Sequence, residues 1–135
     1  MIKYLSLTQV LHIAEVVTGL PFETIKSVAQ IHLIESAIAL PKSTFVGLEP
    51  YPELADKAAI MAFNLAKNHP LPDGNKRLAF MTAYEFCWIN GFELIFDINL
   101  AEKIFFGIAS GEVGFDNFRI WIQQSMKEIH EPHTK

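Results

Sequence analysis

The chain has 135 residues, half of them hydrophobic and 19% charged, and its 11 basic and 15 acidic residues give a formal net charge of −4. This size and balance fit one soluble globular domain, and the negative charge lacks the basic footprint of a protein that binds nucleic acid directly. No apolar run reaches the roughly 18 residues of a membrane span, and no basic-then-apolar leader opens the sequence. A single cysteine cannot form an internal disulfide. We therefore expect one cytoplasmic domain over residues 1–135.

The first part of the chain carries helical signals. Ser6 and Gln9 have the spacing of a capping box, and the apolar stripe that follows them ends at Gly19. A second helix is predicted over residues 23–40, where Pro41 stops it. Both helices present apolar residues at spacings of three and four, so each has one face available for a core.

Residues 41–52 hold three prolines and a glycine, a composition that indicates a loop or flap rather than a helix. Pro52 suits the first turn of the next helix, which must end before His69 because a residue that precedes proline disfavours helical geometry. The remaining predicted elements are a helix over about 75–90, a short extended segment over 92–96 without an obvious partner, a helix over about 97–110 and a last helix over about 116–129. The pattern predicts an all-α, single-domain bundle of about six helices.

Residues 69–77 form the segment that carries chemistry, and they read His-Pro-Leu-Pro-Asp-Gly-Asn-Lys-Arg. They lie before the N-terminus of the central helix, where free amides and the helix dipole attract anions. His69 supplies an imidazole, a group that would accept a proton from an attacking hydroxyl. Asp73 offers the hard oxygen ligand that Mg²⁺ prefers. The segment is therefore interpreted as a nucleotide-handling catalytic loop.

The last four residues of this loop suit phosphate. Gly74 and Asn75 let the backbone turn so that successive amides converge on one anion. The Arg77 guanidinium would donate bidentate hydrogen bonds to two phosphate oxygens, and Lys76 adds a second positive charge. Taken alone, each residue has a plainer role, such as a surface histidine, an Asp-Gly turn or a salt-bridged arginine. The histidines outside the loop match no motif and are expected to be structural or solvated: His12, His32, His130 and His133.

The loop closely resembles the signature of the Fic/Doc family, whose core runs His-Pro-Phe-x-Asp/Glu-Gly/Ala-Asn-Gly/Lys-Arg. Lys76 favours the Doc branch, which comprises small bacterial and phage toxins, and Leu71 replaces the usual Phe with a smaller apolar anchor. Weaker similarities follow the family's order over roughly residues 5–125. They are Ile34-Glu35-Ser36-Ala37 before Pro41, Tyr51-Pro52, Lys57-Ala58-Ala59, Asn90-Gly91 and Ser110-Gly111-Glu112.

The resemblance implies a role for each loop residue: His69 as the catalytic base, Asp73 as the Mg²⁺ ligand, and Gly74, Asn75, Lys76 and Arg77 as the phosphate site for ATP. Members that transfer AMP have Gly at the position of Lys76. A lysine there goes with a reversed nucleotide whose γ-phosphate faces the attacking hydroxyl. The resemblance therefore implies a phosphotransferase of the protein Ser/Thr kinase type, with a translation factor such as an elongation factor as its target.

The sequence lacks the Ser/Thr-x₃-Glu-Gly/Asn pattern by which many Fic proteins inhibit themselves. The resemblance therefore implies neutralisation by a separate Phd-like antitoxin, whose helix would lie in a groove among several aromatic residues: Phe105, Phe106, Phe115, Phe118 and Trp121. Two alternatives stay open, namely transfer of AMP or another nucleotide moiety by the same loop, and a non-catalytic protein that only binds a partner helix. A metallohydrolase is disfavoured because one histidine and one aspartate are too few for a zinc site.

Overall fold

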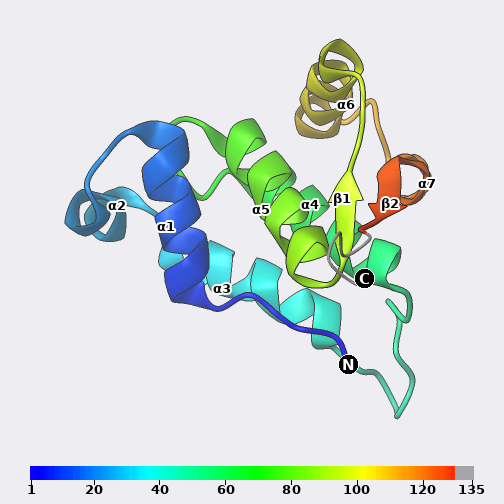
Figure 1. The fold of residues 1–135 in the computed structure, drawn as a ribbon. Helices are drawn as coiled ribbons and strands as arrows, with labels where there is room; N and C mark the ends of the chain where they lie inside the picture. Colours follow the sequence, from blue (N-terminus) through cyan, green and yellow to red (C-terminus); the bar gives the residue numbers. More distant parts are fainter. Residues whose placement is uncertain (130–135) are drawn as a thin grey trace, which may run out of the picture.

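A computed structural model describes residues 1–129, and these residues are mostly helical (Figure 1). In chain order the elements are α1 (Leu7–Thr18), α2 (Phe22–Val28), α3 (Ile31–Ala39), a 3-10 turn η1 (Leu40–Lys42), α4 (Leu54–Asn68), α5 (Asn75–Ile89), β1 (Phe92–Leu94), α6 (Ile98–Ser110), α7 (Phe115–Ser125) and β2 (Met126–Glu128). The expected all-α fold is confirmed, with seven α-helices in the described part of the chain. None of these helices has the length and hydropathy needed to cross a membrane.

The antiparallel pair α4 and α5 forms the centre of the bundle, and the loop that joins them is the predicted catalytic loop (Figure 1). α4 also packs against α3 and α7, while α5 packs against α1. Five alanines of α4 are buried and let these neighbours approach closely: Ala55, Ala58, Ala59, Ala62 and Ala66. Larger buried side chains fill the remaining space, among them Met61, Leu65, Leu78, Phe86 and Phe118. Burial of each such side chain contributes roughly 1.5–3 kcal/mol, so the loop is held between the two best-anchored helices.

The predicted boundaries of several helices are confirmed. Ser6 and Gln9 form the capping box of α1, and Gly19 ends that helix in the left-handed region with φ 76°. The helix predicted over about 97–110 begins as expected, and the Asp97 carboxylate accepts hydrogen bonds from the amides of Asn99 and Leu100 in the first turn of α6. These ends depend on local chemistry, which is why the sequence alone locates them.

The predicted helix over residues 23–40 is wrong in one respect, because the chain breaks it into α2 and α3. Ala29 and Gln30 leave helical geometry, with ψ 147° and 87°. The amide of Gln30 donates to the carbonyl of Pro70 in the catalytic loop at 2.8 Å. No Gly or Pro marks the break, so a tertiary contact overrides the local helical propensity.

The end of the described chain also differs from the prediction. The last helix, expected to run to about Ile129, ends at Ser125, and β2 pairs antiparallel with β1 in the register Phe92↔Glu128 to Leu94↔Met126. The extended segment after α5 therefore has a partner that comes from far along the sequence, which a local pattern cannot reveal. His130 and His133 lie outside the described residues.

Residues 41–52 form the predicted loop and lie at the N-terminal end of α4, whereas the catalytic loop lies at its C-terminal end (Figure 1). The loop tip is a narrow turn in which Phe45 and Leu48 exchange two main-chain hydrogen bonds of 2.8 and 2.9 Å. Lys57 of α4 fastens the loop, because its buried ammonium donates to the Pro41 carbonyl at 2.8 Å and to Glu49 at 3.2 Å.

Candidate functional site

His69 is the C-cap of α4 and adopts a left-handed backbone conformation, with φ 53° and ψ 63°. Among non-glycine residues this conformation is uncommon, and histidine is one of the residue types that tolerate it. The conformation ends the helix and turns the chain into the loop. The His69 side chain is exposed and forms no hydrogen bond within residues 1–129, so its ring is open to solvent.

The loop between the two helices is held from inside. Pro70 and Leu71 are buried, and the Pro70 carbonyl accepts the hydrogen bond from Gln30. The Asn75 side chain, itself 7% exposed, accepts from the Leu71 amide and donates to the Leu71 carbonyl, each at 2.8 Å. Asn75 was expected at the phosphate site. Its amide group is committed to the loop backbone, which leaves only its main-chain N–H to face an anion.

Gly74 is the N-cap of α5 and has φ 89°, a conformation that glycine adopts without strain. A Cβ added at Gly74 would lie 3.3 Å from Val17 Cγ1 and 3.4 Å from Arg77 Nη2. The C-terminal end of α1 therefore packs directly on the turn that begins α5. Sequence reasoning explained this glycine by turn geometry but missed Val17, because nothing in the local sequence links α1 to the loop.

The start of α5 presents free donors and free positive charges. The first helical hydrogen bond runs from Leu78 to the Gly74 carbonyl, and within residues 1–129 the amides of Asn75, Lys76 and Arg77 have no acceptor. Lys76 and Arg77 are exposed, and neither forms an ion pair with a carboxylate of the described chain. Unpaired amides, the positive end of the helix dipole and two cations without a carboxylate partner would favour an anion at this helix start.

A smaller cleft of about 250 Å³ lies between this loop and the α1–α2 region. Asp73 and Arg77 contribute its charged side chains, and the residues opposite them include Thr18, Leu20 and Val28. The Asp73 carboxylate is exposed and has no hydrogen bond or ion pair among the residues described. The same part of the chain contains no cluster of three metal-ligating side chains. One free carboxylate suits Mg²⁺, which takes one or two protein carboxylates and obtains its other ligands from phosphate and water.

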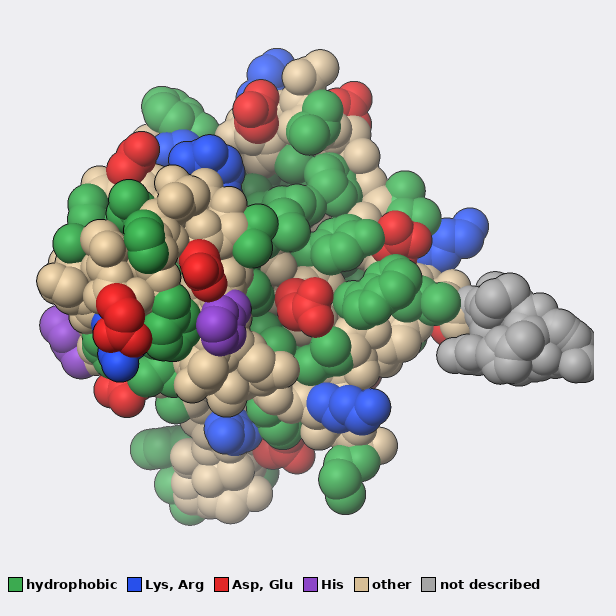
Figure 2. Space-filling model, turned by 60° about the vertical axis from the view of Figure 1, so that its left-hand side comes forward, with side chains coloured by type: hydrophobic (Ala, Val, Ile, Leu, Met, Phe, Trp, Pro, Cys, Tyr) green, Lys and Arg blue, Asp and Glu red, His purple; other side chains and the backbone are tan. Residues whose placement is uncertain are grey.

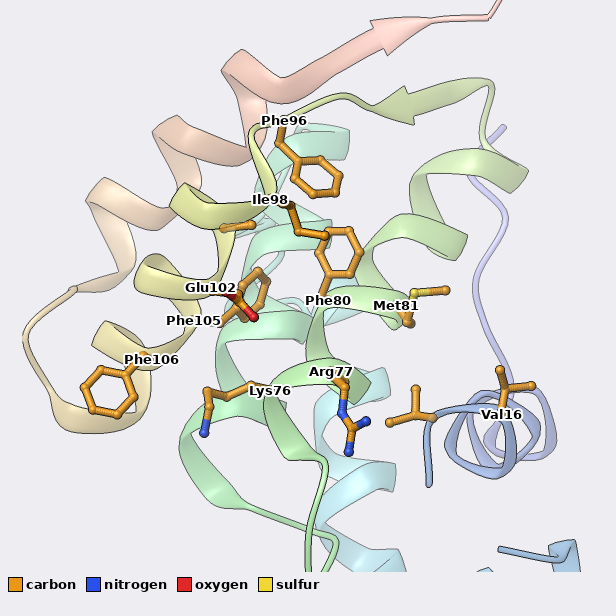
Figure 3. A pocket seen from close by; sticks show the side chains of 12 residues that line it. Val16, Lys76, Arg77, Phe80, Met81, Phe96, Ile98, Glu102, Phe105 and Phe106 are labelled. Carbon is orange, nitrogen blue, oxygen red and sulfur yellow. The ribbon is translucent and has the colours of Figure 1, made fainter. Parts of the chain in front are cut away.

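A larger cleft of about 760 Å³ lies on the other side of the α5 start, between α1, α5 and α6 (Figure 3). Its walls are mostly apolar, and they are completed by Lys76, Arg77 and Glu102. Hydrophobic side chains also form a broad band over the face of the molecule drawn in Figure 2. The predicted aromatic groove is confirmed only in part. Phe105 and Phe106 line the cleft, whereas Phe118 is a core residue and neither Phe115 nor Trp121 contributes to the walls.

The site residues thus fall into three positions. Asp73 and Arg77 share the smaller cleft, and Lys76 and Arg77 share the larger one. His69 lies at the opposite end of the loop and lines neither of them. Arg77 is the side chain common to both clefts.

The sequence model of the Fic/DOC family matches residues 4–87, which include the whole loop and most of α5, and the chain belongs to that family. Members of the family transfer a phosphate or nucleotide group to proteins. The chain is also 41% identical, over 87 residues, to a protein named toxin Doc from Mycolicibacterium smegmatis. That alignment covers 63% of this chain and 67% of the relative. The name of this relative agrees with the Doc branch that Lys76 indicates.

Proposed function

We propose that this protein is a Doc-type toxin that transfers the γ-phosphate of ATP to a hydroxyl group of a target protein. The observation that carries the proposal is the start of α5, where, within residues 1–129, three amides have no acceptor and two cations have no carboxylate partner. The loop before it exposes Asp73 next to this start and His69 at its other end. A triphosphate is the ligand that uses all of these groups. A translation factor such as an elongation factor is the target that the family resemblance suggests.

Each residue has a separate task in the proposed reaction. His69 accepts the proton of the target hydroxyl as its oxygen bonds to the γ-phosphorus, and the bond from that phosphorus to the β,γ-bridging oxygen breaks to release ADP. The amides from Asn75 to Arg77, together with the side chains of Lys76 and Arg77, bind the phosphate oxygens. Asp73 would hold Mg²⁺, which when bound neutralises charge that develops on the phosphates.

The position of the transferred label tests this reaction. With γ-³²P ATP, Mg²⁺ and a cell extract that contains the target, we expect a labelled protein band, and with α-³²P ATP we expect none. Transfer of the α label would instead establish the alternative, AMP transfer by the same loop. His69→Asn is the matched variant, because asparagine also tolerates the left-handed backbone of this position. It should lower transfer by at least about 100-fold, the contribution of a general base.

A separate antitoxin is the partner that fits the larger cleft. The cleft is apolar along its length and cationic at the α5 end, so it suits an amphipathic helix whose apolar face enters it and whose acidic group meets Lys76 or Arg77. Addition of such a Phd-like antitoxin should abolish label transfer. The non-catalytic alternative, a protein that only binds a partner helix, predicts that His69→Asn keeps its effect on cell growth as well as its binding.

A further inference from the structure

We propose that Phe106 is a positioning residue for the anion site and that it makes this site selective for polyphosphates. This inference rests on the proposed function, because it concerns how the same loop holds the phosphate chain of its nucleotide. The carrying observation is a contact between helices: the Lys76 ammonium lies 5.9 Å from the centroid of the Phe106 ring. Lys76 belongs to the first turn of α5, and Phe106 belongs to α6.

The contact directs the lysine without cancelling its charge. An ammonium group over an aromatic ring is attracted by the ring quadrupole, but it keeps its full formal charge. A carboxylate partner would neutralise it. Glu102 lines the same cleft one helical turn before Phe106, yet it forms no ion pair with Lys76 in the described chain. Lys76 is therefore oriented by Phe106 and remains free to attract an anion.

The two cations at the α5 start lie on different sides of the helix. In Figure 3 Arg77 lies on the α1 side of the helix start, between Lys76 and Val16, whereas Lys76 lies on the side of Phe106 and α6. Adjacent residues of an α-helix are separated by about 100° around its axis. Phe106 holds Lys76 on the side of α5 that faces α6, away from Arg77. A single phosphate group placed against one cation would lie farther from the other. A chain of phosphates that crosses the helix start can contact Arg77 with one group and Lys76 with another.

Phe106 is also poorly explained as a core residue. Its side chain is 60% exposed, whereas its neighbour Phe105 is 3% exposed and packs in the core. An exposed phenylalanine contributes little to stability, so its replacement should leave the fold intact. This makes a direct test practical.

The test measures the binding of three probes, Mg-ATP, inorganic tripolyphosphate and inorganic phosphate, to the wild-type protein and to Phe106→Leu. We expect Phe106→Leu to weaken binding of ATP and tripolyphosphate by about two- to five-fold, the strength of an exposed cation–π contact, and to leave inorganic phosphate unchanged. Phe106→Tyr keeps a ring and should restore wild-type binding. Phe45→Leu removes an even more exposed phenylalanine from the distant loop and should change nothing.

A double-mutant cycle separates positioning from a general structural effect. In a Lys76→Ala background, Phe106→Leu should have no further effect on tripolyphosphate binding. An equal loss in both backgrounds would overturn the proposal, and so would equal losses for phosphate and tripolyphosphate.

The contact itself has a signature that needs no ligand or activity. The NMR signals of the Lys76 ε-methylene protons should be shifted upfield by the Phe106 ring, and this shift should vanish in Phe106→Leu and persist in Phe106→Tyr. Unchanged signals in Phe106→Leu would overturn the inference whatever the protein transfers. Conversely, a lost shift with selective loss of tripolyphosphate binding would support it even if no γ-phosphate transfer is found.

Discussion

The side-chain amide of Asn75 forms two hydrogen bonds with the main chain of Leu71, one in each direction and both 2.8 Å long. Together they close the loop into a ring from the first residue of α5 back to the centre of the loop. The loop residues that precede α5 therefore do not need a ligand to hold their shape. This preorganisation is what a site for phosphoryl transfer requires, because its amides and charges must be in place before the reaction.

Asn75→Ala should destabilise the protein and abolish transfer, because it leaves the buried N–H and C=O of Leu71 without partners. We expect a loss of about 1–3 kcal/mol in the free energy of unfolding, the usual penalty for unsatisfied buried groups. Urea unfolding measures this change. Asn68→Ala removes a surface amide whose hydrogen bond reaches only Asn64, and should cost less than about 0.5 kcal/mol. Similar losses for the two variants would contradict the role assigned to Asn75.

Gly74→Ala should impair the anion site more than the fold. An alanine at φ 89° costs roughly 1–2 kcal/mol, and its methyl group would press on Val17 and Arg77. Gly111→Ala is the matched control, because Gly111 has φ 88° but open space around the position of a Cβ. Gly74→Ala should lose at least as much stability in urea as Gly111→Ala, because its methyl group also crowds Val17. Only Gly74→Ala should weaken ATP binding in titration calorimetry, and unimpaired binding would show that α1 does not constrain the turn.

The ion pair of Lys57 and Glu49 should behave asymmetrically. The Lys57 side chain is 3% exposed and that of Glu49 is 58% exposed. Removal of Glu49 therefore leaves a buried charge, whereas removal of Lys57 leaves an exposed one. Glu49→Gln leaves a buried cation with fewer acceptors and should destabilise the protein by about 1 kcal/mol. In a Lys57→Met background the same change should have almost no effect. Equal effects of Glu49→Gln in both backgrounds, measured by urea unfolding, would mean that the pair does not fasten the loop over residues 41–52.

Cys87 should make stability depend on alkaline pH. Burial raises the pKa of this thiol to about 12, from an ordinary value of 9.0. Between these values the unfolded thiol loses its proton while the folded thiol keeps it, so the unfolded state is favoured as the pH rises. The free energy of unfolding should fall from about pH 9 upward by at most about 1.4 kcal/mol per pH unit from this group. Cys87→Ala should flatten that part of the curve, and an unchanged slope would exclude the thiol as its source.

Sequence reasoning succeeded where a short stretch of residues determines the outcome. The capping box at Ser6, the stop at Gly19 and the loop between residues 69 and 77 depend on neighbouring residues, and the structure has them as expected. It failed where distant segments meet. The break before α3 depends on the bond from Gln30 to Pro70, and the pairing of β1 with β2 joins segments on either side of two helices.

The candidate site shows the same division. The sequence located the loop residues and the types of group they carry, but it could not show that the Asn75 side chain is already occupied by Leu71. Nor could it show that Lys76 lies toward Phe106, a residue of another helix. Directions of side chains follow from packing between helices, and no local pattern records that packing.

The hydrogen bond from Gln30 to Pro70 limits how this loop could be reused. An unbroken helix would have used the Gln30 amide within itself, so the interruption between α2 and α3 releases one donor for a segment much later in the chain. Residues 69–77 placed alone in another protein would lack the hydrogen bond from Gln30 and the packing of the C-terminal end of α1. A working copy of this loop in another protein would therefore have to include α1, α2 and α3 as well.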